Sequence, residues 1–302
     1  MDKINMPEEK KDNLKFKPGG RTCAGCGIPL IVNNILENAE YPIASIATSC
    51  LEVTSTIYPY NAWNIPCIHN AFENAAATIA GVELAFNYKK KKGLLSEDQK
   101  KIKFVAFTGD GGAFDIGLQA ISGAFERGHD FTLVVYDNEG YQNTGGQRSG
   151  ATPLEALTTT TPTGKKEKRK NLTEILVAHK SPYIAQAAIH NLPDLKEKAK
   201  KALEAKGPTA LIVLLPCPTM WGFSPSKTIE ISKLAFETNF WPLYEVEGGN
   251  YKITAKPSAK KPIEEFLKTQ KRFDHLAKTP EKIPEIQKAI DQEWESLLKL
   301  AQ

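Results

Sequence analysis

The run Val105-Ala106-Phe107-Thr108-Gly109-Asp110-Gly111-Gly112 decides the fold that we expect for this chain. It has the pattern of a buried strand that ends in a glycine-rich turn, and the helical pattern of residues 114–127 follows it. Glycines in such a turn let backbone N–H groups approach a phosphate closely, at the positive end of the helix. The Asp110 carboxylate would repel that phosphate unless a cation lay between them, and Mg²⁺ prefers such oxygen ligands. The sequence therefore predicts a magnesium and phosphate site at this turn.

A second strand ends in a polar pair that could complete the same site. The apolar run Phe131–Tyr136 stops at Asp137-Asn138, and the amide oxygen of Asn138 is a further candidate ligand for Mg²⁺. The alternative interpretation is a turn followed by an unrelated asparagine. No Gly-Lys-Ser or Gly-Lys-Thr follows the glycines, which disfavours a P-loop, and the absence of Gly-x-Gly-x-x-Gly here disfavours a dinucleotide site.

Strand and helix patterns alternate along the chain on both sides of this stretch. The strand patterns are continuously apolar, as in strands that are buried on both faces. We therefore predict the α/β class, with a mostly parallel, doubly wound sheet. The predicted strands are 43–47, 103–108, 131–136, 184–188 and 209–215, and the predicted helices are 28–39, 70–91, 114–127 and 193–205.

The residues with useful chemistry all follow predicted strands. The carboxyl ends of parallel strands meet at one edge of a sheet, where ligands bind. We expect four loops to converge there: Thr48-Ser49-Cys50, Gly109–Gly112, Asp137–Asn143 and Pro216-Cys217.

The patterns divide the chain into three parts. Residues 1–20 are a polar N-terminal arm, residues 21–225 form the ligand-binding domain, and residues 226–302 are a C-terminal extension. The extension carries scattered aromatic residues and then two charged helical stretches, which is typical of a segment that wraps its own domain or a partner. Within the domain, residues 154–170 are predicted to form a long loop that ends in a basic cluster, residues 164–170, whose role the sequence leaves open.

The composition is that of an ordinary soluble domain. Of 302 residues, 41% are hydrophobic and 25% are charged, so a sizeable core is expected. The net charge of +4 is too small to argue for nucleic acid binding. Lysine runs at 89–92, 165–170 and 196–201 fit solvated helix faces and loops, or a docking surface for an acidic partner. The first twenty residues lack the apolar core of a signal peptide, and no apolar run approaches the roughly 18 residues of a membrane span, so we expect a cytoplasmic protein.

Five cysteines are too few and too scattered for a disulfide scaffold. Cys23 and Cys26 form a Cys-x-x-Cys pair, and Cys50 and Cys217 each follow a predicted strand at the same sheet edge. Four thiolates from three loops suit either a [4Fe–4S] cluster or a structural zinc ion, and their spacing alone does not decide between the two. Cys67 lies in an apolar stretch and is expected to be a buried core thiol.

His69 precedes a predicted helix and lies near enough in sequence to reach the site. A lone histidine is more often a structural residue, so its role stays open, as does that of Cys67.

The whole chain resembles the 2-oxoacid:ferredoxin oxidoreductase family, and within it the β subunits of the pyruvate:ferredoxin oxidoreductases. The resemblance rests on two stretches and extends from the Cys23 loop through Pro216-Cys217-Pro218-Thr219 to the neighbourhood of Arg272. The two stretches are Gly109-Asp-Gly-Gly-Ala-Phe-Asp-Ile-Gly-Leu-Gln-Ala-Ile-Ser-Gly-Ala-Phe-Glu-Arg-Gly-His-Asp130 and Asp137-Asn-Glu-Gly-Tyr-Gln-Asn-Thr-Gly-Gly-Gln-Arg-Ser-Gly-Ala-Thr-Pro153. It implies the diphosphate-binding domain of a thiamine diphosphate enzyme.

By this resemblance, Mg²⁺ is held by Asp110, Asn138 and the backbone carbonyl of Gly140. Asn143 faces the reacting carbon of the cofactor and orients the substrate, and a [4Fe–4S] cluster binds Cys23, Cys26, Cys50 and Cys217. The implied thiamine diphosphate contacts come from Gly109, Asp110, Gly111, Gly112, Asn138, Gly140, Tyr141, Asn143 and Thr144.

The sequence departs from its relatives at two of these positions. Many relatives carry a side chain at the position of Gly140, which a backbone ligand tolerates. Some single-chain relatives carry a polar residue where this chain has Ile28, so the surroundings of the cofactor differ there.

The implied reaction is the reversible oxidative decarboxylation of pyruvate to acetyl-coenzyme A and CO₂, with electrons passing through the cluster to ferredoxin. The implied partners are an α subunit with the pyrimidine-binding domain and the activating glutamate, ferredoxin-like γ and δ subunits, and ferredoxin itself. One alternative keeps the chemistry and changes the acid to 2-oxoisovalerate, 2-oxoglutarate or oxalate. The others are a non-oxidative thiamine enzyme, which needs no cysteine group, and a zinc-binding structural subunit, which needs neither Asp110 nor Asn138.

Overall fold

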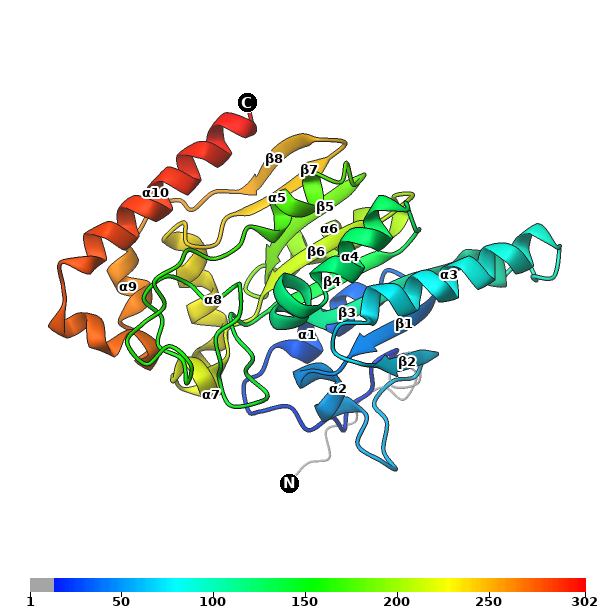
Figure 1. Ribbon diagram of the computed structural model, residues 1–302, viewed down its shortest axis with the longest axis horizontal. Helices are drawn as coiled ribbons and strands as arrows, with labels where there is room; N and C mark the ends of the chain where they lie inside the picture. Colours follow the sequence, from blue (N-terminus) through cyan, green and yellow to red (C-terminus); the bar gives the residue numbers. More distant parts are fainter. Residues whose placement is uncertain (1–13) are drawn as a thin grey trace, which may run out of the picture.

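An eight-stranded sheet forms the centre of the molecule in the computed structural model, which describes residues 14–302 (Figure 1). The strand order is β2-β1-β3-β4-β6-β5-β7-β8. The pairs from β2 through β5 are parallel, whereas β7 runs antiparallel to both β5 and β8. The strands are β1 (Tyr41–Ala47), β2 (Cys67–Asn70), β3 (Ile102–Gly109), β4 (Thr132–Asp137), β5 (Tyr183–Ala188), β6 (Thr209–Leu214), β7 (Leu243–Glu247) and β8 (Asn250–Ala255).

Helices cover both faces of this sheet, each over its own hydrophobic core. Successive residues of β3 show the two sides, because Val105 and Phe107 pack into one core while Phe104 and Ala106 pack into the other. The first core lies under α1 (Ile28–Leu36), α2 (Cys50–Ser55) and α6 (Leu192–Glu204). The second lies under α3 (Ala75–Lys91), α4 (Leu118–Glu126), α5 (Leu172–Val177), α8 (Thr228–Glu237), α9 (Ile263–Leu267) and α10 (Lys282–Leu300). The predicted class, a mostly parallel doubly wound α/β sheet, is confirmed.

Two predicted helices differ from their patterns. Residue 70 belongs to the edge strand β2, and α3 starts at Ala75. The helix predicted over residues 114–127 is divided into a π-helical turn, η3 (Gly111–Ile116), and α4. Gly117 separates them: its N–H bonds to the Gly112 carbonyl at 2.8 Å, and a Cβ there would come within 2.5 Å of that same oxygen. The division therefore follows from a close backbone approach that only glycine allows.

The segment after Pro225 both extends and covers the sheet. It adds β7 and β8 at one edge, and α10 lies along that edge (Figure 1). Its short elements are the 3₁₀ turns η4 (Pro225–Lys227) and η5 (Lys271–Lys278), which follow α7 (Pro218–Trp221) and α9; a third 3₁₀ turn, η2 (Gln99–Lys101), precedes β3. The segment 154–170 carries no helix or strand, as predicted.

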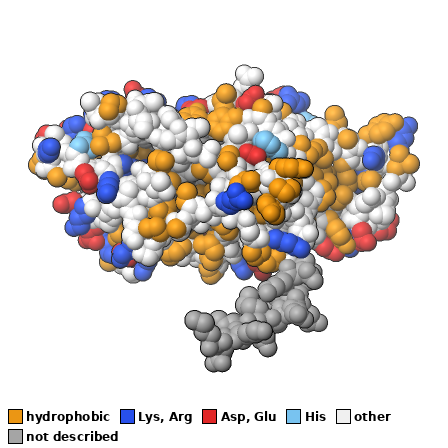
Figure 2. Space-filling view, turned by 90° about the horizontal axis from the view of Figure 1, so that it is seen from below, with side chains coloured by type: hydrophobic (Ala, Val, Ile, Leu, Met, Phe, Trp, Pro, Cys, Tyr) orange, Lys and Arg blue, Asp and Glu red, His pale blue; other side chains and the backbone are white. Residues whose placement is uncertain are grey.

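Most of the predicted N-terminal arm, residues 1–13, lies outside the described residues. The part that follows is packed on the domain: Phe16 is 3% exposed and its ring contacts that of Trp63 edge-on. On the face shown in Figure 2, lysine and arginine side chains are scattered among acidic and apolar ones and do not form one basic patch. Within residues 14–302, no helix is long and apolar enough to cross a bilayer.

Candidate functional site

A cavity of about 210 Å³ lies at the carboxyl ends of β1, β3 and β4. Three of the four loops that were expected to converge at this edge line it, and the fourth reaches it through α7. The lining residues are Thr48, Ser49, Cys50, Phe72, Gly109, Asp110, Gly111, Tyr136, Asn138, Gly140, Tyr141, Gln142, Asn143 and Thr144.

Three oxygen atoms from the predicted magnesium ligands face one another in this cavity. The side-chain amide oxygen of Asn138 lies 2.9 Å from the Oδ1 of Asp110 and 2.9 Å from the backbone oxygen of Gly140. Turned over, the same amide would instead donate to both oxygens; the orientation that points its oxygen at them is the one that a cation between the three oxygens would require. A carboxylate, an amide and a backbone carbonyl are hard oxygen donors of the kind that Mg²⁺ prefers. The donor set therefore fits magnesium.

Asp110 is buried in a setting that disfavours its charge. It is 1% exposed, and burial, followed by the charge of nearby Asp137, raises the pKa of its carboxyl well above the usual value. The hydroxyl of Ser149 donates to Oδ2, and the N–H of Asn138 donates to Oδ1 at 3.3 Å. These two hydrogen bonds offset only part of the free-energy cost of burying the charged Asp110 carboxylate. A bound cation would offset the rest of that cost.

The glycines of the turn leave room for atoms that a side chain would displace. A Cβ on Gly111 would lie 2.4 Å from the Tyr141 ring, and a Cβ on Gly112 would lie 2.2 Å from the Thr108 hydroxyl. The Tyr141 hydroxyl in turn donates to Asp115 at 3.0 Å, which fixes the ring over the turn. The turn therefore combines backbone N–H groups at a helix start with a closely packed wall, as a phosphate cradle requires.

Two of the four predicted cluster cysteines lie in a tight loop before α1. The N–H of Cys26 bonds to the carbonyl of Cys23 at 3.0 Å. Gly25 between them has a φ of +74°, and a Cβ there would come within 2.3 Å of the Pro225 oxygen. The Thr228 hydroxyl also donates to the Gly25 carbonyl at 2.8 Å. The C-terminal segment thus holds the Cys-x-x-Cys loop against the sheet edge.

The four cysteines lie within electrostatic range of one another. Burial, with a smaller contribution from the neighbouring cysteines, raises the pKa of Cys26 to about 11 and that of Cys50 to about 12. Burial also raises the pKa of Cys217. All four are free thiols. Among residues 14–302, no three histidine, cysteine or acidic side chains converge closely enough to bind a single metal ion.

His69 and Cys67 lie beside this site and do not line its cavity. His69 bonds to the Thr48 hydroxyl at 2.9 Å and lies 3.5 Å from Glu52. Cys67 is partly buried in the edge strand β2, against the core under α1.

Residues 47–213 match the family model described as the thiamine pyrophosphate enzyme C-terminal TPP binding domain. The chain is 50% identical to the pyruvate synthase subunit PorB of Thermotoga maritima, over 97% of this chain and 94% of that one. It is also 50% identical to PorB of Methanocaldococcus jannaschii, over 93% and 96% of the two chains.

The chain belongs to the PorB family of thiamine pyrophosphate enzymes.

Two further proteins to which the chain is similar are named for different acids. The ketoisovalerate oxidoreductase subunit VorB of Pyrococcus abyssi is 42% identical, over 99% of each chain. A solved 2-oxoglutarate:ferredoxin oxidoreductase from Magnetococcus marinus is similar with a TM-score of 0.58 and 25% identity, over 72% of this chain and 71% of that one.

The structure brings nearly all of the predicted cofactor residues of this PorB-family chain together. All of them line the cavity except Gly112, which lies beneath it against Thr108. Sequence reasoning placed the loops of Thr48, Ser49 and Gln142 at this edge but assigned these side chains no role, and it did not select Phe72 and Tyr136, which also line the cavity, or Ser149, which bonds to Asp110. Tyr136 and Ser49 share a hydrogen bond beside Cys50. Ser49 directly precedes Cys50 and Gln142 directly precedes Asn143 in sequence, and that adjacency was the available signal for these two residues.

Proposed function

We propose that this chain is the β subunit of a pyruvate:ferredoxin oxidoreductase, a multi-subunit enzyme that converts pyruvate, coenzyme A and ferredoxin to acetyl-coenzyme A, CO₂ and reduced ferredoxin. The observation that carries the proposal is the arrangement of Asp110, Asn138 and Gly140 in a cavity that Cys50 also lines. The PorB relatives supply the choice of pyruvate.

Asp110, Asn138 and the Gly140 carbonyl would hold Mg²⁺, and the turn at Gly111 and Gly112 would hold the diphosphate. Thiamine diphosphate, once bound, supplies the electron sink for decarboxylation of a 2-oxoacid. Asn143 and Thr144 line the same cavity, so Asn143 is the side chain of this chain that we expect to orient the substrate. The rings of Phe72 and Tyr141 lie 5.7 Å apart between centroids, tilted by 40°, and would help to exclude water from one wall of the cavity.

The four-cysteine group would hold a [4Fe–4S] cluster, with Cys50 next to the thiamine cavity. The pKa of Cys50 is raised by Cys217, Cys26 and Cys23 as well as by burial, so the four cysteines form one group. Thiolate groups of this kind bind either zinc or a [4Fe–4S] cluster, and the electron transfer of the proposed reaction supports the cluster. The short separation of cavity and cluster would provide an exit for single electrons.

The site needs a second chain. A volume of about 210 Å³ is below the roughly 300–1,000 Å³ of pockets that enclose ligands of this kind. Among the lining residues, Asp110 is the only acid, so none is a glutamate that could activate the aminopyrimidine ring. We therefore expect an α subunit to supply the pyrimidine half, and γ and δ subunits to carry electrons to ferredoxin.

The test is an anaerobic assay of the purified complex with coenzyme A, a viologen acceptor and a panel of 2-oxoacids. We expect pyruvate to give the highest kcat/KM. The VorB relative makes 2-oxoisovalerate the second candidate, and a preference for that acid would change the assigned substrate. Turnover of none of the acids would overturn the proposed function.

A further inference from the structure

The loop that carries Asn138 and Gly140 also carries two buried carboxylates that no predicted ligand set uses. Asp137 and Glu139 are 0% and 1% exposed, and Asp110 lies beside them. Burial raises the pKa of both Asp137 and Glu139, and the nearby arginines oppose that rise. Three carboxylates buried at one place require positive charge within contact distance, because desolvation of unpaired ions is very costly.

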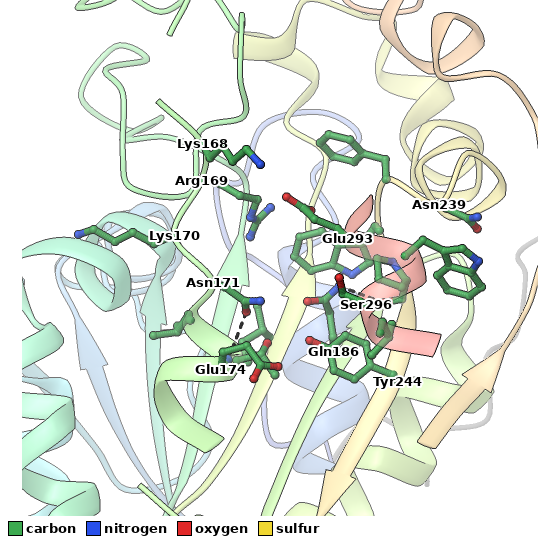
Figure 3. Close-up of a pocket in the computed structure, with 18 of the residues that line it drawn as sticks. Lys168, Arg169, Lys170, Asn171, Glu174, Gln186, Asn239, Tyr244, Glu293 and Ser296 are labelled. Carbon is green, nitrogen blue, oxygen red and sulfur yellow. Dashed lines mark hydrogen bonds between the residues drawn. The ribbon is translucent and has the colours of Figure 1, made fainter. Parts of the chain in front are cut away.

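Two arginines from distant segments supply that charge. Arg169, from the basic cluster 164–170, lies 2.7 Å from Asp137 and 3.3 Å from Glu139. Arg272, from η5 in the C-terminal segment, lies 2.7 Å from the other oxygen of Glu139. Figure 3 shows the guanidinium of Arg169 directed toward Glu293 of α10. The two arginines therefore approach the loop from different directions.

Arg272 also reaches Asn138 by a second route. Its guanidinium lies 3.6 Å above the ring of Trp221, and the indole Nε1 of Trp221 donates to the Asn138 carbonyl at 2.9 Å. The Nε–H of Arg272 donates to the side-chain oxygen of Gln270 at 2.8 Å. The backbone carbonyl of Arg272 accepts a hydrogen bond from the N–H of Leu157 at 2.9 Å. Arg272 is therefore held in place by contacts that do not involve the Asn138–Gly140 loop.

Glu139 has a backbone conformation that needs such support. Its φ is +62°, in the left-handed region that costs energy for a residue with a side chain. It is the residue between Asn138 and Gly140, so its conformation decides whether the Asn138 amide and the Gly140 carbonyl face Asp110 together. The Glu139 carbonyl is also fixed, by the Thr152 hydroxyl at 2.8 Å.

We propose that Arg272 is a positioning residue for the magnesium site: through Glu139 and Trp221 it holds the Asn138–Gly140 loop in the shape that presents its two oxygens to the cation. This rests on the proposed function, because the cation is the one that binds thiamine diphosphate. Arg169 anchors Asp137, at the start of the same loop. The C-terminal segment is thus part of the cofactor site without touching the cofactor.

The experiment measures how tightly magnesium binds. The complex is stripped of metal and thiamine diphosphate under anaerobic conditions, and Mg²⁺ is titrated calorimetrically at saturating thiamine diphosphate. Residues that orient metal ligands typically change metal affinity by about 10- to 100-fold. We expect a loss of that size in Arg272→Met, with no loss in Arg127→Met, an exposed arginine at the end of α4.

A double-mutant cycle separates positioning from general weakening of the fold. If Arg272 acts through Glu139, Glu139→Gln and the double variant should lose about the same affinity as Arg272→Met. Wild-type magnesium affinity in Arg272→Met, or losses that multiply in the double variant, would overturn the proposal. If Arg272→Met does not fold, Arg272→Lys keeps the charge and loses the flat stacking on Trp221: a several-fold loss supports the proposal, and unchanged affinity overturns it. An unmodified complex that binds no magnesium and thiamine diphosphate would contradict the proposed function itself.

Discussion

The indole Nε1 of Trp221 donates a hydrogen bond of 2.9 Å to the backbone carbonyl of Asn138. Trp221 ends α7, which begins directly after Cys217, and Asn138 is a proposed magnesium ligand. This hydrogen bond joins the segment that follows Cys217 to the loop of the proposed metal site. A mutation that shifts one of the two segments should therefore shift the other.

We expect Trp221→Phe to reduce the free energy of unfolding by about 1–2 kcal/mol, since a buried hydrogen bond and part of a ring are lost. The loss should be at the low end because Gln142 still donates to the same carbonyl at 2.7 Å. Thiamine diphosphate affinity should also fall several-fold. Urea unfolding and calorimetry measure the two effects. Trp63→Phe, which removes an indole bond to Ser55 under the opposite face, is the control, and an equal loss of affinity in that variant would contradict the link.

Asp110→Asn should stabilise the cofactor-free chain while it abolishes cofactor binding. The buried carboxylate is disfavoured by desolvation and by Asp137, so an uncharged amide of the same shape should raise the free energy of unfolding by about 1–3 kcal/mol. Addition of Mg²⁺ and thiamine diphosphate should then raise the Tm of the wild-type protein and leave that of the variant unchanged. Asp130→Asn, at a half-exposed position, should respond to the cofactor like wild type; a cofactor-dependent Tm in Asp110→Asn would refute the ligand role.

Cys50→Ser should lose the iron–sulfur cluster, whereas Cys67→Ser should keep it. The other three cysteines of the group contribute to the raised pKa of Cys50. The pKa of Cys67 is raised by burial, without a contribution from another cysteine. Iron content, the broad visible absorption and the paramagnetic resonance signal after reduction report on the cluster in anaerobically purified protein. Stoichiometric zinc without iron in the wild-type protein would exclude the cluster.

The full-length chain should lose stability as the pH falls from 6.5 toward 4, and His190 should account for part of that loss. Burial lowers the pKa of His190 from 6.5 to about 4, against the opposing charges of Asp194 and Glu237. Between these two values the unfolded chain binds a proton that the folded chain excludes, so stability rises with pH across this window. The full effect of lowering the pKa from 6.5 to about 4 is about 3–4 kcal/mol. In His190→Gln, urea unfolding at pH 7 and pH 4.5 should show a correspondingly smaller difference, and an identical pH dependence would contradict the assignment.

Much of the fold could be predicted because the inner strands are buried on both faces and are therefore continuously apolar, as in β3 and β4. The edges were missed for the same physical reason. Strand β2 is only half-buried, and β8 alternates between exposed and partly buried residues. Such short, mixed patterns do not distinguish an edge strand from a loop.

Some residues of the candidate site could be selected from the sequence, and others are revealed only by the structure. Asp110 and Asn138 each follow an apolar strand, so the sequence pattern could select them as candidate ligands, whereas Gly140 was selected only through the family resemblance. Arg272 and Trp221 contact the same loop from a segment that is remote in sequence. A single arginine or tryptophan among many carries no local signal for such a contact, and only the three-dimensional packing of the C-terminal segment reveals it.

The ion pair between Glu139 and Arg272 also sets an order of events during protein synthesis. A chain emerges from the ribosome with its N-terminal end first, so the metal loop is made long before the arginine that supports it. Until η5 has been synthesised and has packed against the loop, Glu139 lacks one of its two counter-charges and the site cannot reach its final shape. On the proposed role of Arg272, cofactor binding would wait until nearly the whole chain exists, and truncated nascent products would lack the support of the proposed magnesium site.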